Sequence, residues 1–179
     1  MQAIVRTFRP DEWPVYKVLR LRSLEDTPNA FGSTLALELL RADTEWTERA
    51  RRAATSGNDC ALFAQLAGVP SGLVWAKADA IDPHTVNIFQ MWVAPQARGR
   101  GLGSALLNAA IHWARQYGAH SAKLGVTCGD TPAVRLYRRA GFRDMGVKEP
   151  LREGSEVLAQ TMVLSLVEVA TSSYRGFAA

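Results

Sequence analysis

The segment Gln96–Ser104 is dense in glycine and arginine, and it precedes a long stretch with helical apolar spacing. Gly99, Gly101 and Gly103 allow the backbone to turn sharply and to come close to a ligand. Amides at the start of a helix lack an acceptor within the helix, and the helix dipole adds partial positive charge there. These features together predict a cradle for a phosphate group. A tight strand-to-helix turn without any ligand is the alternative interpretation.

The spacing of these glycines excludes two common nucleotide-binding loops. A Walker loop ends in Gly-Lys-Ser or Gly-Lys-Thr, and that triplet is absent here. A dinucleotide-binding loop reads Gly-x-Gly-x-x-Gly, whereas Gly99, Gly101 and Gly103 are each separated by a single residue. The loop therefore belongs to neither class.

The apolar patterning predicts the elements that must hold this loop in place. A strand at Val86–Val93 leads into it, and a helix from about Leu102 to Tyr117 follows, with Gly118 as its end. A short strand at Lys123–Thr127 comes next. This strand–helix–strand crossover implies one parallel strand pair inside an otherwise antiparallel sheet.

The remaining chain predicts further strands and helices around the same sheet. Asp11, Asp43-Thr44 and Asp130 are expected to cap helices, because their side chains can accept the free amides of a first turn. Residues 30–40 are ambiguous. Further strands are expected at 3–9, 60–66, 72–78 and 158–166. The order is strand, two helices, three strands, helix, strand, helix, strands, which indicates an α/β (α+β) mixed sheet flanked by helices.

Length and composition fit one ordinary domain. The chain has 179 residues, of which 47% are hydrophobic and 21% charged, enough apolar material for a core. We expect a single domain at residues 1–166 and a tail at 167–179. The 2 Cys and 3 His predict neither a disulfide framework nor a metal site. No apolar run of about eighteen residues and no secretory signal are visible, so no membrane segment is expected and the cytoplasm is the expected compartment.

The net charge of +4 favours anionic partners in general and does not single out nucleic acid. One arginine-rich set, formed by Arg135, Arg138, Arg139 and Arg143, is interrupted by apolar and glycine residues. A solvated helix face is the simpler interpretation of this set, and a role facing an anion is the alternative. No aromatic–basic pattern supports a nucleic-acid-binding module, so no nucleic-acid partner is expected.

Two motifs resemble one known family. Residues 93–103 look like the acetyl-coenzyme A signature of the GNAT (GCN5-related) N-acetyltransferases, Arg/Gln-x-x-Gly-x-Gly/Ala, which Arg98, Gly101 and Gly103 satisfy. Residues 130–142 resemble a second element, Asn-x-x-Ala-x-x-Leu-Tyr-x-x-x-Gly-Phe, with Asp130 in place of the usual asparagine. The stretch 19–32 is similar to the opening of a common subgroup. The resemblance therefore covers roughly residues 3–166.

The resemblance implies a GNAT-like fold, a mostly antiparallel sheet with one splayed parallel pair. It also implies acetyl-CoA as cosubstrate, no metal, and an amine acceptor on a small molecule or a peptide or protein N-terminus. In the family the two N-terminal helices cover the acceptor site, where Phe31 and Trp46 are best placed. An oxyanion donor is expected among the amides of Met91–Val93. The residues expected to bind the cofactor are Trp92, Val93, Arg98, Gly99, Arg100, Gly101, Leu102, Gly103, Ser104 and Asp130.

Tyr137 falls on the family's tyrosine, whose hydroxyl is proposed to protonate the departing sulfur, so the resemblance implies a general acid there. A tyrosine packed in the core is the alternative. Asp130 is expected to contact the cofactor or, more simply, to cap its helix. Cys128 could carry an acyl group, but a small buried residue is the simpler interpretation.

No general base can be assigned from the sequence. Many relatives carry a glutamate on the strand before the loop, where this chain has Asn87, and an amide cannot act as a base. A water chain helped by His84, Asp79 or Asp82 is one solution. The other is a weakly basic acceptor, because an α-amino group with a pKa of about 7.7–8.0 is partly neutral at neutral pH.

Two further interpretations stay open. A non-catalytic acyl-CoA sensor would use the same cradle, and the missing glutamate motivates that alternative. A homodimer is also open, because the apolar region 157–169 could extend a sheet across two copies.

Overall fold

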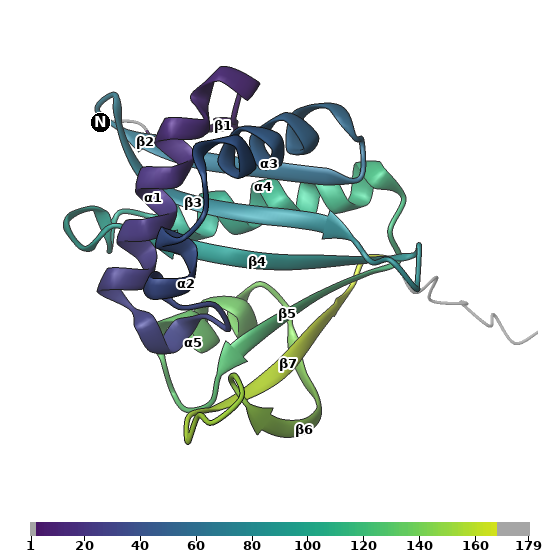
Figure 1. Ribbon diagram of the computed structural model, residues 1–179. Coiled ribbons are helices and arrows are strands. Elements are labelled where there is room, and N and C mark those ends of the chain that lie inside the picture. Colours follow the sequence, from purple (N-terminus) through teal and green to yellow (C-terminus); the bar gives the residue numbers. More distant parts are fainter. Residues whose placement is uncertain (1–2, 168–179) are drawn as a thin grey trace, which may run out of the picture.

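A computed structural model describes residues 3–167, and within that range the strands form one seven-stranded sheet in the order β1-β2-β3-β4-β5-β7-β6 (Figure 1). Strands β4 and β5 are parallel, and the other neighbours are antiparallel. This confirms the predicted mixed sheet. The strands are β1 (Ala3–Thr7), β2 (Asp59–Leu66), β3 (Val69–Ala78), β4 (Thr85–Val93), β5 (Ser121–Thr127), β6 (Arg143–Pro150) and β7 (Leu158–Ser165).

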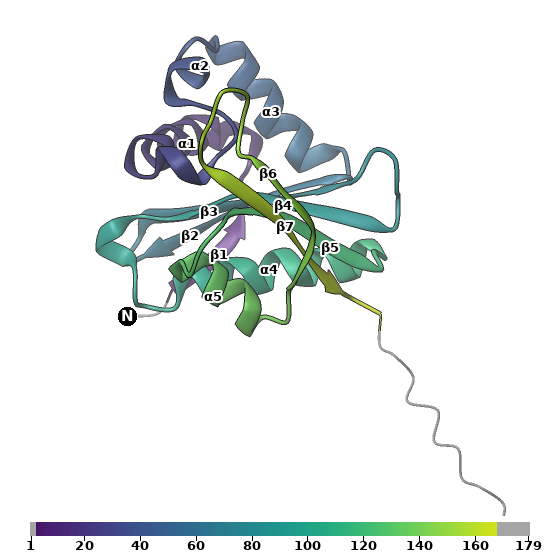
Figure 2. The ribbon, with the colours of Figure 1, turned by 90° about the horizontal axis from the view of Figure 1, so that it is seen from below.

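Helices cover both faces of the sheet (Figure 2). Helices α1 (Trp13–Asp26), α2 (Leu35–Leu39) and α3 (Asp43–Thr55) lie on one face. Helices α4 (Leu102–Tyr117) and α5 (Pro132–Arg139) lie on the other. Helix α4 links β4 to β5, as the parallel pairing of those strands requires.

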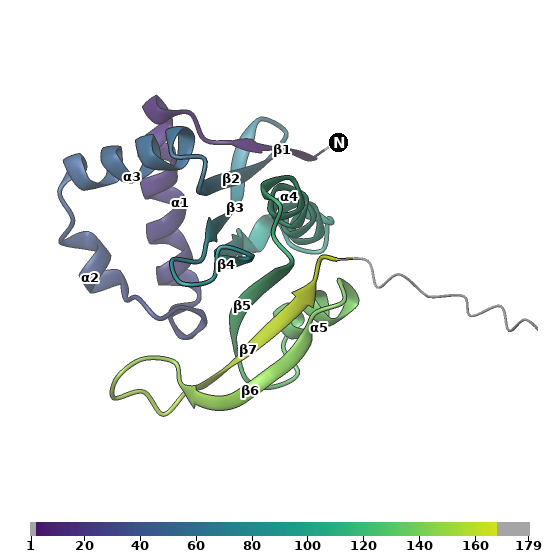
Figure 3. The same cartoon turned by 90° about the vertical axis from the view of Figure 1, so that its right-hand side faces the viewer.

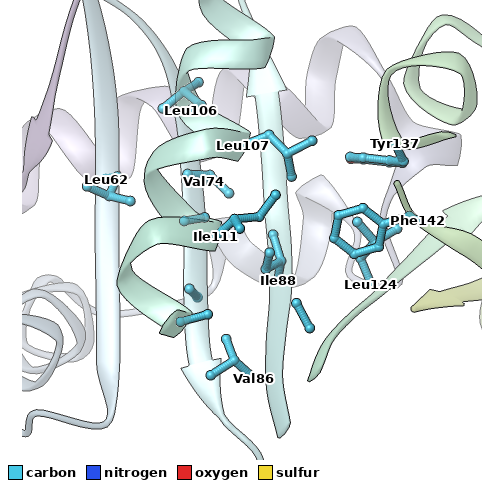
Figure 4. Packing of buried hydrophobic residues seen from close by; sticks show 14 of the residues in the cluster. Leu62, Val74, Val86, Ile88, Leu106, Leu107, Ile111, Leu124, Tyr137 and Phe142 are labelled. Carbon is cyan, nitrogen blue, oxygen red and sulfur yellow. The ribbon is translucent and has the colours of Figure 1, made fainter. Parts of the chain in front are cut away.

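Each face has its own hydrophobic core. On the α4 side, Leu106, Leu107 and Ile111 pack against strand residues that include Val74 and Ile88 (Figure 4). On the opposite side, aromatic residues dominate the contacts between the sheet and the N-terminal helices; they include Phe8, Tyr16, Trp46, Phe63, Trp75 and Trp92. The two cores fix the sheet between its helix layers.

Strands β4 and β5 separate after a short paired stretch. Their pairing covers Thr85–Ile88 and Ser121–Leu124 only. Beyond it, β5 leaves β4 together with β7 and β6, and the sheet opens (Figure 3). The backbone edges in the second half of these two strands thus face an opening instead of one another.

Helix α2 is held by a buried carboxylate. Glu38 accepts hydrogen bonds from Arg41 at 2.7 Å and Arg49 at 3.2 Å, and Arg20 lies 3.8 Å away. Burial alone would raise the pKa of Glu38, but the hydrogen bond from Arg41 and the nearby arginine charges outweigh it and lower that pKa. The ambiguous residues 30–40 therefore contain a short helix that tertiary ion pairs stabilise.

Three predicted helix caps were wrong by one or two residues. Asp11 lies in a 3-10 turn (Pro10–Glu12) before α1. Asp43 lies in the first turn of α3, whose Glu45 accepts the Ala42 amide at 3.1 Å. Helix α5 is capped by Thr131, which accepts the Val134 amide at 3.1 Å, and not by Asp130.

Strand β6 had no predicted range of its own, since all eight of its residues are exposed and show no alternation. The predicted tail lies almost wholly outside the described residues 3–167, so the division at 166/167 stays a prediction. A dimer formed through residues 157–169 also stays a prediction, because residues 168 and 169 lie outside the described range. Among the residues described, no helix is long and apolar enough to cross a membrane.

Candidate active site

A bulge in β4 faces the opening between the strands. Leu73 pairs with Trp92 and Trp75 with Phe89, so two residues of β4 oppose a single residue of β3. Gln90, one of the two, has a left-handed φ of 54°. Its side chain lies on the α1 side of the sheet, where the Tyr16 hydroxyl donates to Gln90 Oε1 at 3.0 Å. The bulge thus shifts the side-chain alternation and the backbone direction just before the glycine loop.

The Tyr16 hydroxyl is expected to hold this bulge in place. Tyr16→Phe leaves the buried Gln90 oxygen without its donor, which should lower the free energy of unfolding by about 1–3 kcal/mol. Urea denaturation measures the change. Tyr117→Phe is the matched control, because the Tyr117 hydroxyl is exposed and makes only a 3.4 Å contact with Asn58. Equal, small effects of the two variants would contradict the role of Tyr16.

The end of β4 presents its backbone to the opening. The Ala94 amide donates to Ser71 O of β3 at 2.8 Å, so the backbone groups of Val93 point the opposite way. Arg98 Nε donates to Val93 O at 2.9 Å, which agrees with that direction. The Val93 amide therefore faces the side that β5 has left.

The glycine loop has the geometry that the sequence predicts. Gly99 and Gly101 have left-handed φ angles of 71° and 81°, a conformation that favours glycine. The first bond of α4 runs from the Ala105 amide to Gly101 O at 3.0 Å, so the amides of residues 102–104 precede the helical ladder. A Cβ on Gly101 would meet no atom within 4 Å. These amides and this open space can hold an anion.

Tyr137 lies in α5 on the same opening. Its ring is buried, with Phe142 edge-on at 6.0 Å between ring centroids. Burial raises the pKa of Tyr137 to about 12. Within residues 3–167 its hydroxyl has no hydrogen-bond partner, yet the atom is not sealed from solvent. The predicted general acid thus combines a core-packed ring with a hydroxyl that remains available.

These groups line one pocket of about 750 Å³. Its walls come from the ends of β4 and β5, the starts of α4 and α5, and the segment Thr27–Ala30. Of the predicted cofactor residues, eight line it: Trp92, Val93, Arg98, Gly99, Gly101, Leu102, Gly103 and Ser104.

Four predicted site residues lie outside this lining. Arg100 is exposed, and Asp130 pairs with Arg135 at 2.8 Å on the surface. Phe31 is buried under the Arg20 guanidinium, 4.7 Å from the ring centroid. Trp46 is completely buried beside Tyr16, so the structure places it in the core and not at the pocket.

The candidate bases lie at the wrong end of β4. His84, Asp79 and Asp82 surround the start of the strand, whereas the pocket begins at Met91. At about 3.3 Å per residue, the two ends of β4 are more than about 20 Å apart. The Asn87 amide and two backbone amides also lower the pKa of Asp79 to about 2. These three side chains therefore lie too far from the pocket to contact an amine there.

Arg139 and the segment Thr27–Ala30 are among the lining residues that the sequence did not indicate. Arg139 lines it, whereas Arg135 and Arg138 pair with Asp130 and Asp144. Arg139 belongs to the arginine-rich set noted in the sequence, but the sequence does not show which arginine of that set lines the pocket. The segment Thr27–Ala30 has no side chain that marks a catalytic or phosphate-binding role. Tertiary contacts between distant parts of the chain bring it to the pocket. Among residues 3–167, no three His, Cys, Asp or Glu side chains gather as metal ligands would.

Comparison with known proteins gives a family and a fold. Residues 20–142 match the acetyltransferase (GNAT) family. Mycothiol acetyltransferase from Pseudarthrobacter chlorophenolicus is 39% identical over 89 residues, 46% of this chain but only 28% of that relative's length. A GNAT-family acetyltransferase from Streptococcus pneumoniae is 26% identical with a TM-score of 0.79, over 93% of this chain and 100% of that one. The structure of yncA from Salmonella typhimurium with its cofactor acetyl-CoA shares the fold, with a TM-score of 0.78 and 20% identity over 97% and 99% of the two chains.

These matches include the parts that form the pocket. The family match runs from α1 to Phe142 and so contains the glycine loop, the end of β5 and α5. The structural match extends over nearly all of the chain. The resemblance indicated by the two sequence motifs is confirmed, and this chain belongs to the acetyltransferase (GNAT) family.

Proposed function

We propose that this chain transfers the acetyl group of acetyl-CoA to a primary amine, on a small molecule or on a peptide or protein N-terminus. The proposal rests on a pocket that is lined both by the glycine loop and by Tyr137. Its volume of about 750 Å³ lies within the range of cofactor pockets, roughly 300–1,000 Å³.

The start of α4 supplies the binding site for the pyrophosphate. The free amides of residues 102–104 and the partial positive charge of the helix start favour a doubly anionic group. Gly101 leaves open the space that a side chain would occupy. Arg139, on the pocket wall, adds a formal positive charge for the phosphates.

The exposed edge of β4 supplies the site for the pantetheine arm. The Val93 amide points into the opening, and an amide-containing chain can pair with such an edge as an added strand. The arm then carries the thioester along β4 toward the bulge at Gln90. An amide among Met91–Val93 donates to the carbonyl oxygen as negative charge develops on it.

Acetyl transfer then requires one bond to form and one to break. The amine nitrogen attacks the carbonyl carbon, a C–N bond forms, and the C–S bond breaks. The Tyr137 hydroxyl gives its proton to the departing sulfur, and the proton released by the amine nitrogen restores the hydroxyl. A pKa of about 12 keeps Tyr137 protonated, and thus able to donate, throughout the neutral range.

Within the described range 3–167, no Asp or Glu side chain lines the pocket, which bears on the choice of acceptor. Asn87 replaces the family's glutamate and donates to Asp79 at 2.7 Å, away from the pocket. An amine must then reach the site already neutral. A lysine amine, with a pKa of about 10.4, is almost wholly charged at pH 7, whereas an α-amine near 7.7–8.0 is partly neutral. We therefore favour an α-amine or a small-molecule amine of similar basicity.

The same observation favours a second candidate function. A protein that binds acyl-CoA without a base to activate an acceptor could act as a sensor of that thioester. The sensor needs the glycine loop but not the Tyr137 hydroxyl. The two functions thus differ in whether free thiol is released.

A screen with acetyl-CoA and a panel of amines tests the proposal. The panel contains amino acids, peptides with a free N-terminus, the same peptides with a blocked N-terminus and a free lysine, and polyamines. We expect thiol release and a mass increase of one acetyl group, with α-amines ahead of lysine amines at pH 7 and the gap narrowing toward pH 10. Binding of acetyl-CoA without acetylation of any amine would favour the sensor.

A further inference from the structure

Residues Thr27–Ala30, here called the strap, cross the opening between β4 and β5. All four line the pocket. On the β5 side, the Thr127 hydroxyl donates to Asn29 O at 2.6 Å. On the side of the β6–β7 loop, Arg152 donates to Pro28 O at 3.1 Å and to Phe31 O at 3.0 Å. The strap is thus tied to strands that diverge from β4.

The Asp26 carboxylate links the strap to the end of β4 and to Arg98. Asp26, the last residue of α1, directly precedes the strap. Its Oδ2 accepts from Trp92 Nε1 at 2.8 Å and also from Arg98 Nη2. Arg98 in turn donates to Val93 O at 2.9 Å. Asp26 therefore connects the strap with the end of β4 and with the first residue of the glycine loop motif.

The position of Asp26 is locally unfavourable, which indicates a tertiary role. A carboxylate in the last turn of a helix meets the negative end of the helix dipole. The Asp26 side chain is 24% exposed and the Arg98 side chain 47%, so solvent screens their interaction only in part. Residues that break a local rule and gain a specific partner are typical of functional positions.

We propose that Asp26 is a positioning residue that couples occupancy of the glycine loop to the position of the strap, through Arg98. Among residues 3–167, Arg98 Nη1 has no hydrogen-bond partner, so an anion in the loop can take that nitrogen while Nη2 keeps Asp26. A bound phosphate fixes the guanidinium, and the guanidinium fixes Asp26 and the strap. The acceptor amine then binds next to the strap, and the position of the strap depends on whether acetyl-CoA is bound. This inference rests on the proposed function, since it needs the loop to bind the acetyl-CoA pyrophosphate.

Hydrogen–deuterium exchange with and without acetyl-CoA tests the coupling and needs no acceptor. In the unmodified chain, acetyl-CoA should slow exchange both in a peptide covering residues 99–105 and in one covering the strap, by about fivefold or more in the strap. In Asp26→Asn, the loop peptide should still be protected and the strap peptide should not. Asp26→Glu, which keeps the charge, should restore part of the strap protection.

Glu25→Gln is the matched control, because it makes the same charge change one residue away at an exposed side chain. It should behave like the unmodified chain. Thermal melting shows whether each variant folds, and Asp26→Ser replaces Asp26→Asn if the latter does not. Strap protection that persists in Asp26→Asn, or loop protection without strap protection in the unmodified chain, would overturn the coupling alone. No protection in either peptide of the unmodified chain would instead overturn the proposed function.

Discussion

Gly101→Glu is expected to abolish measurable binding of acetyl-CoA. Gly101 has a left-handed φ of 81°, and a side chain there would enter the open space in front of the α4 amides. Two unit charges about 4 Å apart repel by about 4 kcal/mol at an effective dielectric constant of about 20. That repulsion weakens binding by about a thousandfold. Isothermal titration calorimetry with acetyl-CoA measures the loss.

The chain offers a matched control for this substitution. Gly57 also has a left-handed φ, 72°, with no atom within 4 Å of an added Cβ, and it does not line the pocket. Gly57→Glu adds the same charge and similar backbone strain and should keep the affinity of the unmodified chain. Gly101→Ala separates strain from charge and should weaken binding less than Gly101→Glu does. Unchanged affinity in Gly101→Glu would contradict the role of the glycine loop in binding acetyl-CoA.

Tyr137→Phe is expected to lower kcat by about 10²–10⁴-fold and to leave the affinity for acetyl-CoA nearly unchanged. General acids contribute about this much to the rates of proton-transfer reactions. The ring is buried against Phe142, so phenylalanine should keep the packing and remove only the hydroxyl. Steady-state kinetics with the best acceptor from the amine screen, together with calorimetry, separate the two effects.

The pH dependence of the rate gives a second test of Tyr137. Its folded pKa of about 12 lies above the ordinary value of 10, so the hydroxyl is protonated at every pH below about 11. The rate should therefore rise with pH as the acceptor amine loses its proton, without a fall near pH 10 that ionisation of Tyr137 would cause. Tyr117→Phe is the control and should leave kcat unchanged. A kcat in Tyr137→Phe equal to that of the unmodified chain would contradict the general-acid role and favour the packed-core interpretation.

The sequence predicted those parts of the site whose conformation depends only on neighbouring residues. Helix α4 begins at Leu102 and ends before Gly118 as expected, because glycine adopts the left-handed conformation at both ends. The Thr131 cap was missed by one residue since both Asp130 and Thr131 can accept a first-turn amide. In the fold, Asp130 pairs with Arg135 and leaves the cap to its neighbour.

The parts that depend on distant contacts could not be predicted. The bulge at Gln90 breaks strand alternation, and the Gln90 side chain accepts a hydrogen bond from a hydroxyl on α1 that lies 74 residues away in the sequence. The strap reaches Thr127 across 98 residues. Among the residues that the structure describes, strand β6 pairs only with β7, and it buries no side chain, so its sequence shows no strand pattern. Trp46 was expected near the acceptor because of its helix, but the aromatic core between α1, α3 and the sheet encloses it.

A crystal structure of the chain with acetyl-CoA is the decisive test of the proposed donor site. We expect the pyrophosphate within hydrogen-bond distance of the amides at the start of α4, the pantetheine arm along Val93, and the sulfur next to the Tyr137 hydroxyl. A donor bound elsewhere, or a pocket that stays empty at saturating acetyl-CoA, would contradict it.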